Sequence, residues 1–169
     1  MNIIKEGHKL VVHDIQIDSA TSHLEAGARW ATTPEEVAEQ SEIIVTSLPG
    51  PLEVEAVAFG EAGLKEGLSK GKIYMDLSTS SPRLIREIHE VFAKQGVHVL
   101  DAPVSGGPEG ARTRKLAVWV GGSKEVFEQA RPVLDAIGDK PYYVGPIGAG
   151  TVAKLVHNCA GYIIQTGLA

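Results

Sequence analysis

The alternation of short apolar runs with helical segments is the sequence feature that most constrains the fold. Six runs rich in β-branched residues predict strands, at residues 9–15, 42–48, 72–77, 97–100, 116–120 and 142–144. Helix signals separate most of them, at residues 19–26, 34–40, 51–59, 82–95 and 123–137. Strand and helix alternate roughly every 25–30 residues, which is typical of a mostly parallel sheet covered by helices on both faces. The sequence therefore predicts a doubly wound α/β fold.

Several helix boundaries follow from single residues. Thr33 is expected to cap the helix that begins at Pro34, because its hydroxyl can accept a free N–H of the first turn. Ser123 is expected to cap the segment that ends at Ile137 in the same way. Pro132 lies inside that segment and has no N–H to donate, so we expect a kink there or a helix that begins later.

Both ends of the chain carry helical segments that are incomplete by themselves. Residues 2–6 are helical in character and Gly7 closes them, but no residue before them can cap a first turn. Residues 148–169 form one apolar-rich helical stretch without a polar closing turn. We expect a truncated chain, in which a strand and a loop are missing before the first helix and Ile163, Ile164 and Leu168 face an absent part. The alternative is that both terminal helices pack on this domain.

Composition argues against several classes of function. The 169 residues include 21 acidic and 16 basic side chains, and the net charge of −5 argues against a nucleic-acid partner. The single cysteine rules out an internal disulfide framework and fits a reducing compartment, such as the cytoplasm or the mitochondrial matrix. The six histidines have no metal-ligand spacing, and no apolar run is long enough for a membrane-spanning helix. We therefore expect neither a metal site nor a membrane partner.

The segment from Asp101 to Pro108 is a candidate anion site. Gly106 and Gly107 follow Ser105, and two glycines in a row can turn consecutive backbone N–H groups toward one anion. The Ser105 hydroxyl adds a further donor. A substrate carboxylate would suit this arrangement, and the alternative is an ordinary tight loop.

The segment from Gly145 to Asn158 is a candidate site of proton transfer. Its glycines release the chain from a strand and begin a helix, in which Lys154 and Asn158 are four residues apart and share one face. The neighbours of Lys154 are apolar, and burial disfavours the charged form of an amine, so Lys154 could act as a proton donor and acceptor. The alternative is a lysine that extends from the edge of the helix to water.

Polar or glycine-containing turns follow three predicted strands. Asp14 ends the first strand, where an acid can accept hydrogen bonds from the ribose hydroxyls of a dinucleotide, and no arginine stands beside it for a 2′-phosphate. Residues 46–50 and 76–79 end the second and third strands, where ligands bind in open α/β sheets. The acid at the position of Asp14, without a neighbouring arginine, favours NAD over NADP. The alternatives are a solvated aspartate and two ordinary strand-to-helix turns.

Together these pieces resemble the β-hydroxyacid dehydrogenase family, which includes 3-hydroxyisobutyrate, tartronate semialdehyde and 6-phosphogluconate dehydrogenases. The resemblance covers nearly the whole chain, and its motifs occur in the family's order. Its two most specific parts are the substrate loop and the catalytic segment. The matching motifs are residues 2–8, Val12-His13-Asp14, Leu48-Pro49, Asp76–Thr79, Asp101–Gly107 and Gly148-x-Gly150-x-x-x-Lys154-x-x-x-Asn158.

The resemblance implies hydride transfer between a nicotinamide and the 3-hydroxyl carbon of a small hydroxy acid, with the semialdehyde as its oxidised partner. Lys154 would act as general acid and base, and Asn158 would hold the substrate and Lys154 in register. The carboxylate would bind at Ser105, Gly106 and Gly107. The full-length protein is expected to be a homo-oligomer. The residues expected to contact the cofactor are Asp14, Leu48, Pro49 and Thr79.

The chain departs from the family pattern in four places. The Gly-x-Gly-x-x-Gly loop that binds the pyrophosphate and the all-helical second domain do not occur in it. We therefore expect residues 1–147 to form an incomplete dinucleotide-binding domain and residues 148–169 to begin the helix that leads to the second domain. Glu53 replaces a common asparagine, and Arg114 replaces a common glycine. The alternative function is a non-catalytic module for dimerisation or partner binding.

Overall fold

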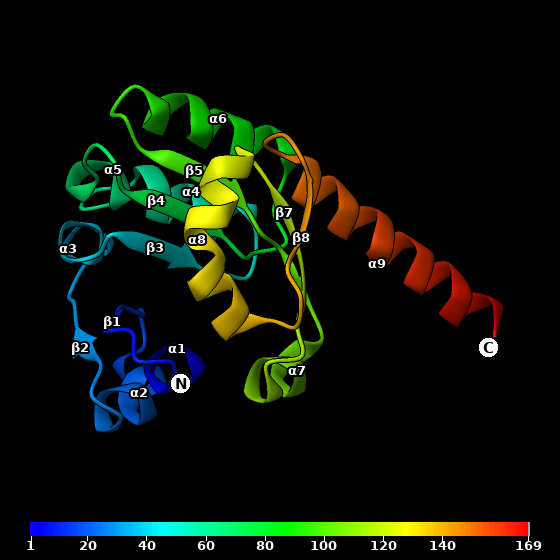
Figure 1. The fold of residues 1–169 in the computed structure, drawn as a ribbon, viewed down its shortest axis with the longest axis horizontal. Coiled ribbons are helices and arrows are strands. Elements are labelled where there is room, and N and C mark those ends of the chain that lie inside the picture. Colours follow the sequence, from blue (N-terminus) through cyan, green and yellow to red (C-terminus); the bar gives the residue numbers. More distant parts are fainter. Residues whose placement is uncertain (169) are drawn as a thin grey trace.

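The computed structural model describes residues 1–168 and has an α/β core from which the long helix α9 (Ala149–Gly167) projects (Figure 1). In the larger sheet, the first three strands run parallel to one another. The strands are β3 (Ile43–Thr46), β4 (Ile73–Asp76), β5 (His98–Asp101), β6 (Val104–Ser105), β7 (Ala117–Gly121) and β8 (Tyr142–Gly145). Strand β7 runs antiparallel to the first three strands, and β8 pairs parallel with β7. The predicted doubly wound, mostly parallel α/β fold is confirmed.

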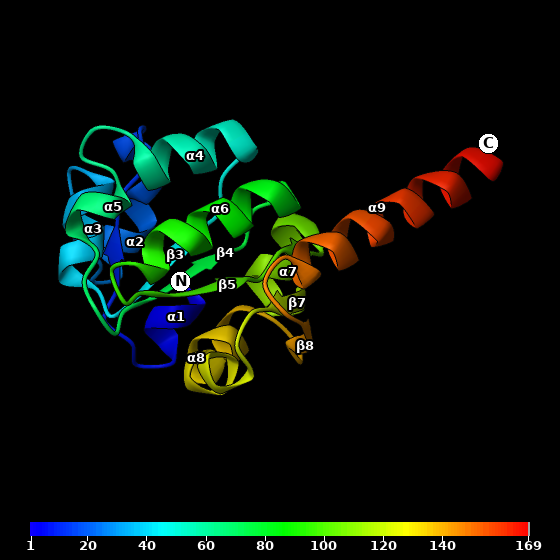
Figure 2. The same ribbon diagram turned by 90° about the horizontal axis from the view of Figure 1, so that it is seen from above.

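Helices cover both faces of this sheet because strand residues alternate between the two sides. Tyr74 packs on one face, edge-on against Phe92 at 5.5 Å, whereas its neighbours Ile73 and Met75 pack on the other. The first face is covered by α3 (Pro34–Gln40), α4 (Pro51–Phe59), α5 (Leu64–Gly67) and α6 (Pro82–Ala93). The second is covered by α1 (Asn2–Lys5) and α8 (Lys124–Ile137), as Figure 2 shows.

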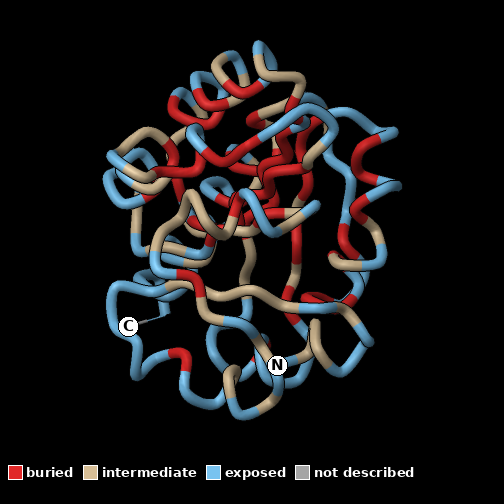
Figure 3. The backbone as a smooth tube through the Cα atoms, turned by 90° about the vertical axis from the view of Figure 1, so that its left-hand side faces the viewer, coloured by how far each residue is buried: buried red, intermediate tan, exposed pale blue. Residues whose placement is uncertain are grey.

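Residues 8–31, which follow α1, form a separate unit with little core. Its strands β1 (Val11–Val12) and β2 (Arg29–Trp30) make a parallel two-stranded sheet of their own. A short 3₁₀ turn (Ile17–Ala20) and α2 (Thr21–Glu25) connect them. Only Ala20 and Ala31 of this unit are buried, and Figure 3 shows that the part of the chain near the N-terminus carries few buried positions. A cavity of about 800 Å³, lined by residues of α1, β1, α3 and β3, separates the unit from the larger sheet.

Most predicted helix boundaries are confirmed. The Thr33 hydroxyl accepts the N–H of Glu36 at 3.2 Å, as expected for a cap. The later helix start expected from Pro132 is wrong, because α8 begins at Lys124 and continues through this residue, whereas the alternative of a kink stays a prediction. Pro132 is exposed, so water can bond the carbonyl that its missing N–H leaves free.

Two further details differ from the expectations. Ser123 occupies the cap position of α8, but its hydroxyl donates to the Glu125 carboxylate instead of accepting a backbone N–H. The segment after Ser105, treated above as a loop, contains the helix α7 (Gly107–Thr113). None of the helices within residues 1–168 combines the length and the apolarity needed to cross a bilayer.

Candidate active site

A buried carboxylate joins the end of β5 to the beginning of α9. Asp101, the last residue of β5, is 1% exposed. One of its oxygens accepts the N–H of Gly148 at 2.7 Å. The other accepts the N–H of Thr151 at 2.6 Å and the Thr151 hydroxyl at 2.8 Å. The negative charge thus meets the free N–H groups and the positive end of the helix dipole.

Two glycines let α9 approach the sheet closely. A Cβ on Gly150 would lie closer than 3.0 Å to the carbonyl oxygens of Trp119 and Asp101. A Cβ on Gly121 would lie equally close to the Asp101 carboxylate and to the Gly150 nitrogen. No larger residue fits at either position without moving backbone, so the sequence fixes the start of α9 against β5 and β7.

Lys154 follows one turn later and is 7% exposed. Its Nζ lies 5.9 Å from the centroid of the Trp119 ring, and within residues 1–168 it has neither an ion pair nor a hydrogen bond. Burial lowers the pKa of the Lys154 amine from its ordinary value, because the charged form is poorly solvated. An amine in this condition gives up its proton more readily than an exposed lysine.

The Ser-Gly-Gly segment lies at the same cavity as Lys154. Gly106 and Gly107 have φ angles of +132° and +59°, which turn the chain from β6 into α7. Ser105, Gly106, Gly107 and Lys154 all line one cavity of about 690 Å³ at the carboxyl ends of β3 and β4. The structure therefore brings the candidate anion site and the candidate proton donor together, although they are almost 50 residues apart in the sequence.

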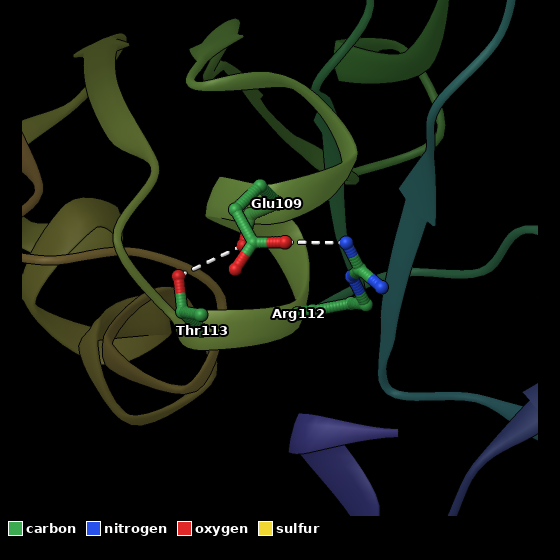
Figure 4. Close-up of polar contacts among 3 residues, drawn as sticks. All are labelled: Glu109, Arg112 and Thr113. Atoms are coloured by element: carbon green, nitrogen blue, oxygen red, sulfur yellow. Dashed lines mark hydrogen bonds and ion pairs between the residues drawn. The ribbon is translucent and has the colours of Figure 1, made fainter.

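Helix α7, which follows this segment, is held by its own polar side chains. Figure 4 shows Glu109 paired with Arg112, while the Thr113 hydroxyl donates to the Glu109 carbonyl at 2.8 Å. The helix ends at Arg114, which adopts a left-handed φ of +61° and forms an ion pair with Glu6 of the α1 region. A non-glycine residue in this conformation is strained.

His157, which sequence reasoning did not select, contacts the Ser105 hydroxyl from α9, although it is exposed and does not line the cavity. Its Nε2 lies 3.3 Å from the Ser105 hydroxyl, and its ring centroid lies 4.9 Å from that of Trp119. The signal was present in the sequence, because His157 is three residues after Lys154 on a helix and so lies near its face. Asn158, the residue predicted there, is half-buried and does not line the cavity.

The turns after β3 and β4 are tied together by a second buried carboxylate. Asp76 accepts the Thr46 hydroxyl at 2.9 Å and the N–H of Ser78 at 3.0 Å. The Ser78 hydroxyl in turn accepts the N–H of Leu48 at 2.9 Å. Burial raises the pKa of Asp76 above its ordinary value, the bonds from Ser78 and Thr46 oppose that rise, and the charge of Asp101 adds to it.

The four predicted cofactor residues lie outside this cavity. Leu48, Pro49 and Thr79 belong to the turns after β3 and β4, and the neighbouring residues Ser47 and Leu77 do line it. Asp14 follows β1, is exposed, and accepts the N–H of Gln16 at 2.8 Å through one oxygen.

No group of three or more histidine, cysteine, aspartate or glutamate side chains in the described part of the chain could hold a metal ion.

Comparison with known proteins gives a consistent result. One family model, the NAD binding domain of 6-phosphogluconate dehydrogenase, matches residues 1–145. The 3-hydroxyisobutyrate dehydrogenase of Pseudomonas aeruginosa is 37% identical over 168 residues, which cover 99% of this chain and 56% of that protein. The NAD-dependent L-serine dehydrogenase of the same organism is 33% identical over 168 residues, with the same coverage of 99% and 56%.

Solved structures agree with the sequence comparison. The structure of Mycobacterium tuberculosis 3-hydroxyisobutyrate dehydrogenase with L-serine has a TM-score of 0.92 to this chain at 29% identity, over 98% of this chain and 56% of that one. The chain thus spans about half the length of the curated relatives it matches.

Proposed function

Because the chain belongs to the NAD-binding domain family of 6-phosphogluconate dehydrogenase, we propose that it is part of an oxidoreductase acting on a small 3-hydroxy acid or its semialdehyde. The observation that carries this proposal is the single cavity lined by both Lys154 and the Ser105-Gly106-Gly107 segment. One group can move a proton there, and the other can hold an acid.

Lys154 is the proposed general acid and base. Its lowered pKa makes the unprotonated amine easier to reach than in an exposed lysine, so that Nζ can take the proton of the substrate hydroxyl. A bound nicotinamide would supply the hydride acceptor for the carbon that carries this hydroxyl. In the reverse direction, Lys154 returns the proton to the oxygen.

The proposed substrate carboxylate binds at Ser105, Gly106 and Gly107, with Asn158 holding the substrate against Lys154. The names of two relatives support this substrate class, since 3-hydroxyisobutyrate and L-serine both carry a hydroxyl on the carbon next to the one that bears the carboxylate. A hydroxyl at that position separates the reacting carbon from the carboxylate. The carboxylate can then bind the Ser105-Gly106-Gly107 segment while the hydroxyl faces Lys154.

The proposed cofactor is NAD, with NADP as the less favoured partner. Asp14 carries an oxygen that has no hydrogen-bond partner among residues 1–168, and a carboxylate there would repel a 2′-phosphate while accepting ribose hydroxyls. Leu48, Pro49 and Thr79 would contact the cofactor from the turns that Asp76 and Ser78 hold together.

We also propose how residues 1–147 and 148–169 divide. The cavity between β1 and β3 lies between two parallel sheets and is large enough for one further strand, which would complete the dinucleotide-binding domain and deliver a Gly-rich phosphate loop. Along α9, Tyr162, Ile163 and Ile164 are each more than 60% exposed, and they suit the start of an all-helical domain and a homo-oligomer.

The test is oxidation of hydroxy acids by a chimera that adds the flanking segments of the Pseudomonas aeruginosa 3-hydroxyisobutyrate dehydrogenase to both ends of this chain. We expect NAD reduction with 3-hydroxyisobutyrate or L-serine and none with 2-hydroxybutyrate, an oxidisable secondary alcohol of the same size as 3-hydroxyisobutyrate whose hydroxyl is on the carbon that bears the carboxylate. Equal rates with the 2-hydroxy acid would overturn the proposed substrate class.

The exposed apolar side chains of α9 favour one alternative, a non-catalytic module for dimerisation or partner binding. Calorimetry with NAD and sedimentation of the chain distinguish the two. A stable oligomer without NAD binding, together with a silent chimera, would favour the alternative.

A further inference from the structure

We propose that Asp101 is a positioning residue, whose carboxylate fixes the first turn of α9 and thereby sets where the Lys154 amine lies relative to the Ser105-Gly106-Gly107 segment. The catalytic meaning of this inference rests on the proposed function. The positioning itself does not, because it can be measured without substrate or cofactor.

The hydrogen bonds of Asp101 lie one helical turn before the Lys154 amine. Asp101 bonds Gly148 and Thr151, and Lys154 follows Thr151 by three residues, so the anchored turn and the amine lie on one face of the helix. Beyond Lys154 the helix projects from the sheet and is mostly exposed (Figures 1 and 2). Contacts outside the first turn include those of Lys154 with the Trp119 ring and of His157 with Ser105, whereas the first turn has three buried hydrogen bonds to Asp101.

The backbone of Asp101 is also linked to the Ser105-Gly106-Gly107 segment. Asp101 pairs with Gly121, and Ser105 pairs with Ala117 in the same register along β7. The intervening Ala102 and Pro103 are buried. The backbone of Asp101 is thus fixed to the Ser-Gly-Gly segment, while its side chain is fixed to the helix that carries Lys154. One residue connects the two halves of the cavity.

Asp76 is a matched comparison for Asp101 within the same sheet. Asp76 stands beside Asp101 in register on β4 and is also buried. Its hydrogen bonds go to Thr46 and Ser78, however, and none goes to α9. If buried charge at this edge acted only through general stability, the two carboxylates would affect Lys154 alike. The different partners predict different effects.

The experiment measures the pH midpoint for acetylation of Lys154 by acetic anhydride in the complete 169-residue chain, read by peptide mass spectrometry. In Asp101→Asn, which keeps the size of the side chain but cannot accept all three bonds, we expect the midpoint to rise by about half a unit or more as the amine gains water. Amide exchange at Gly148 and Thr151 is expected to accelerate about tenfold or more.

The direction of the shift separates positioning from charge. Removing a nearby negative charge would by itself lower the pKa of a lysine, and burial is the cause of the present shift of Lys154. A rise in Asp101→Asn, with no change in Asp76→Asn, supports positioning. An unchanged or lowered midpoint in folded Asp101→Asn overturns it.

Two variants of Thr151 keep the test decisive if Asp101→Asn does not fold. Thr151→Val removes one of the three hydrogen bonds and keeps the shape, so a smaller upward shift is expected. Thr151→Ser keeps the hydroxyl and should behave as the wild type. Equal midpoints in both variants would overturn the proposal, whereas failure of the chimera to oxidise hydroxy acids would leave the positioning intact and overturn only the proposed function.

Discussion

The edge of the sheet around Asp101 and the N-terminal β1–β2 unit belong to one chain but differ in how firmly they are built. At the Asp101 edge, backbone packs on backbone, and a buried carboxylate ties the sheet to α9. In the first 31 residues only Ala20 and Ala31 are buried, and a cavity of about 800 Å³ separates the unit from β3. The region proposed for proton transfer is therefore firmly packed, while the region proposed for the cofactor ribose is loosely attached.

The largest expected contrast is between the hydrophobic core of the larger sheet and the N-terminal unit. Phe92 is fully buried between Tyr74 and Phe59, with ring centroids at 5.5 and 6.0 Å. Phe92→Ala should lower the free energy of unfolding by about 4 kcal/mol. Val12→Ala, in the half-buried β1, should lower it by about 1 kcal/mol or less. Urea denaturation followed by circular dichroism measures both, and equal losses would remove the contrast.

A second contrast concerns glycines. Gly150→Ala places a Cβ against main-chain oxygens and should cost about 3 kcal/mol, because backbone must move. Gly27→Ala meets no atom within 4 Å, although its φ is +97°, so it should cost about 1 kcal/mol of backbone strain. Thermal unfolding of both variants tests this prediction. A Gly27→Ala loss as large as that of Gly150→Ala would contradict the picture of a loose N-terminal unit.

The pH dependence of stability tests the buried carboxylate of Asp76, which lies beside Asp101 at the edge of the sheet. Burial raises the pKa of Asp76 above its ordinary 3.8, so its protonated form is favoured in the folded state. The stability gained this way is present below pH 3.8 and is lost as pH rises through the raised pKa. Asp76→Asn imitates the protonated form and should become increasingly more stable than the wild type from pH 4 to pH 7. Urea titrations across that range should show the difference growing, and a constant difference would contradict it.

The smallest expected effect is at the junction of the two regions. Arg114 has a left-handed φ of +61° and pairs with Glu6 across the surface. Arg114→Gly relieves the strain, and the ion pair lost is half-exposed and weak. The variant should gain up to about 1 kcal/mol in unfolding free energy. Arg114→Ala loses the same ion pair without the freedom of glycine, so it serves as the matched control and should not gain stability.

Much of the fold could be predicted because alternation of strands and helices leaves a strong pattern, and residues such as Thr33 mark helix starts through local hydrogen bonds. The meeting of Lys154 with Ser105 was predicted only through the family resemblance, since no local pattern links residues so far apart. The role of Asp101 as a partner of α9 depends on long-range packing that its neighbours do not reveal. The later helix start expected from Pro132 was wrong because the tolerance of a proline inside a helix depends on its exposure, which only the folded chain fixes.

The most direct test of the proposed chemistry is the turnover of the Lys154→Met chimera. Methionine fills a similar volume but cannot exchange a proton, so turnover of the hydroxy acid should fall by about a hundredfold or more, while circular dichroism shows the fold unchanged. Turnover retained at the wild-type rate in a folded Lys154→Met chimera would contradict the account.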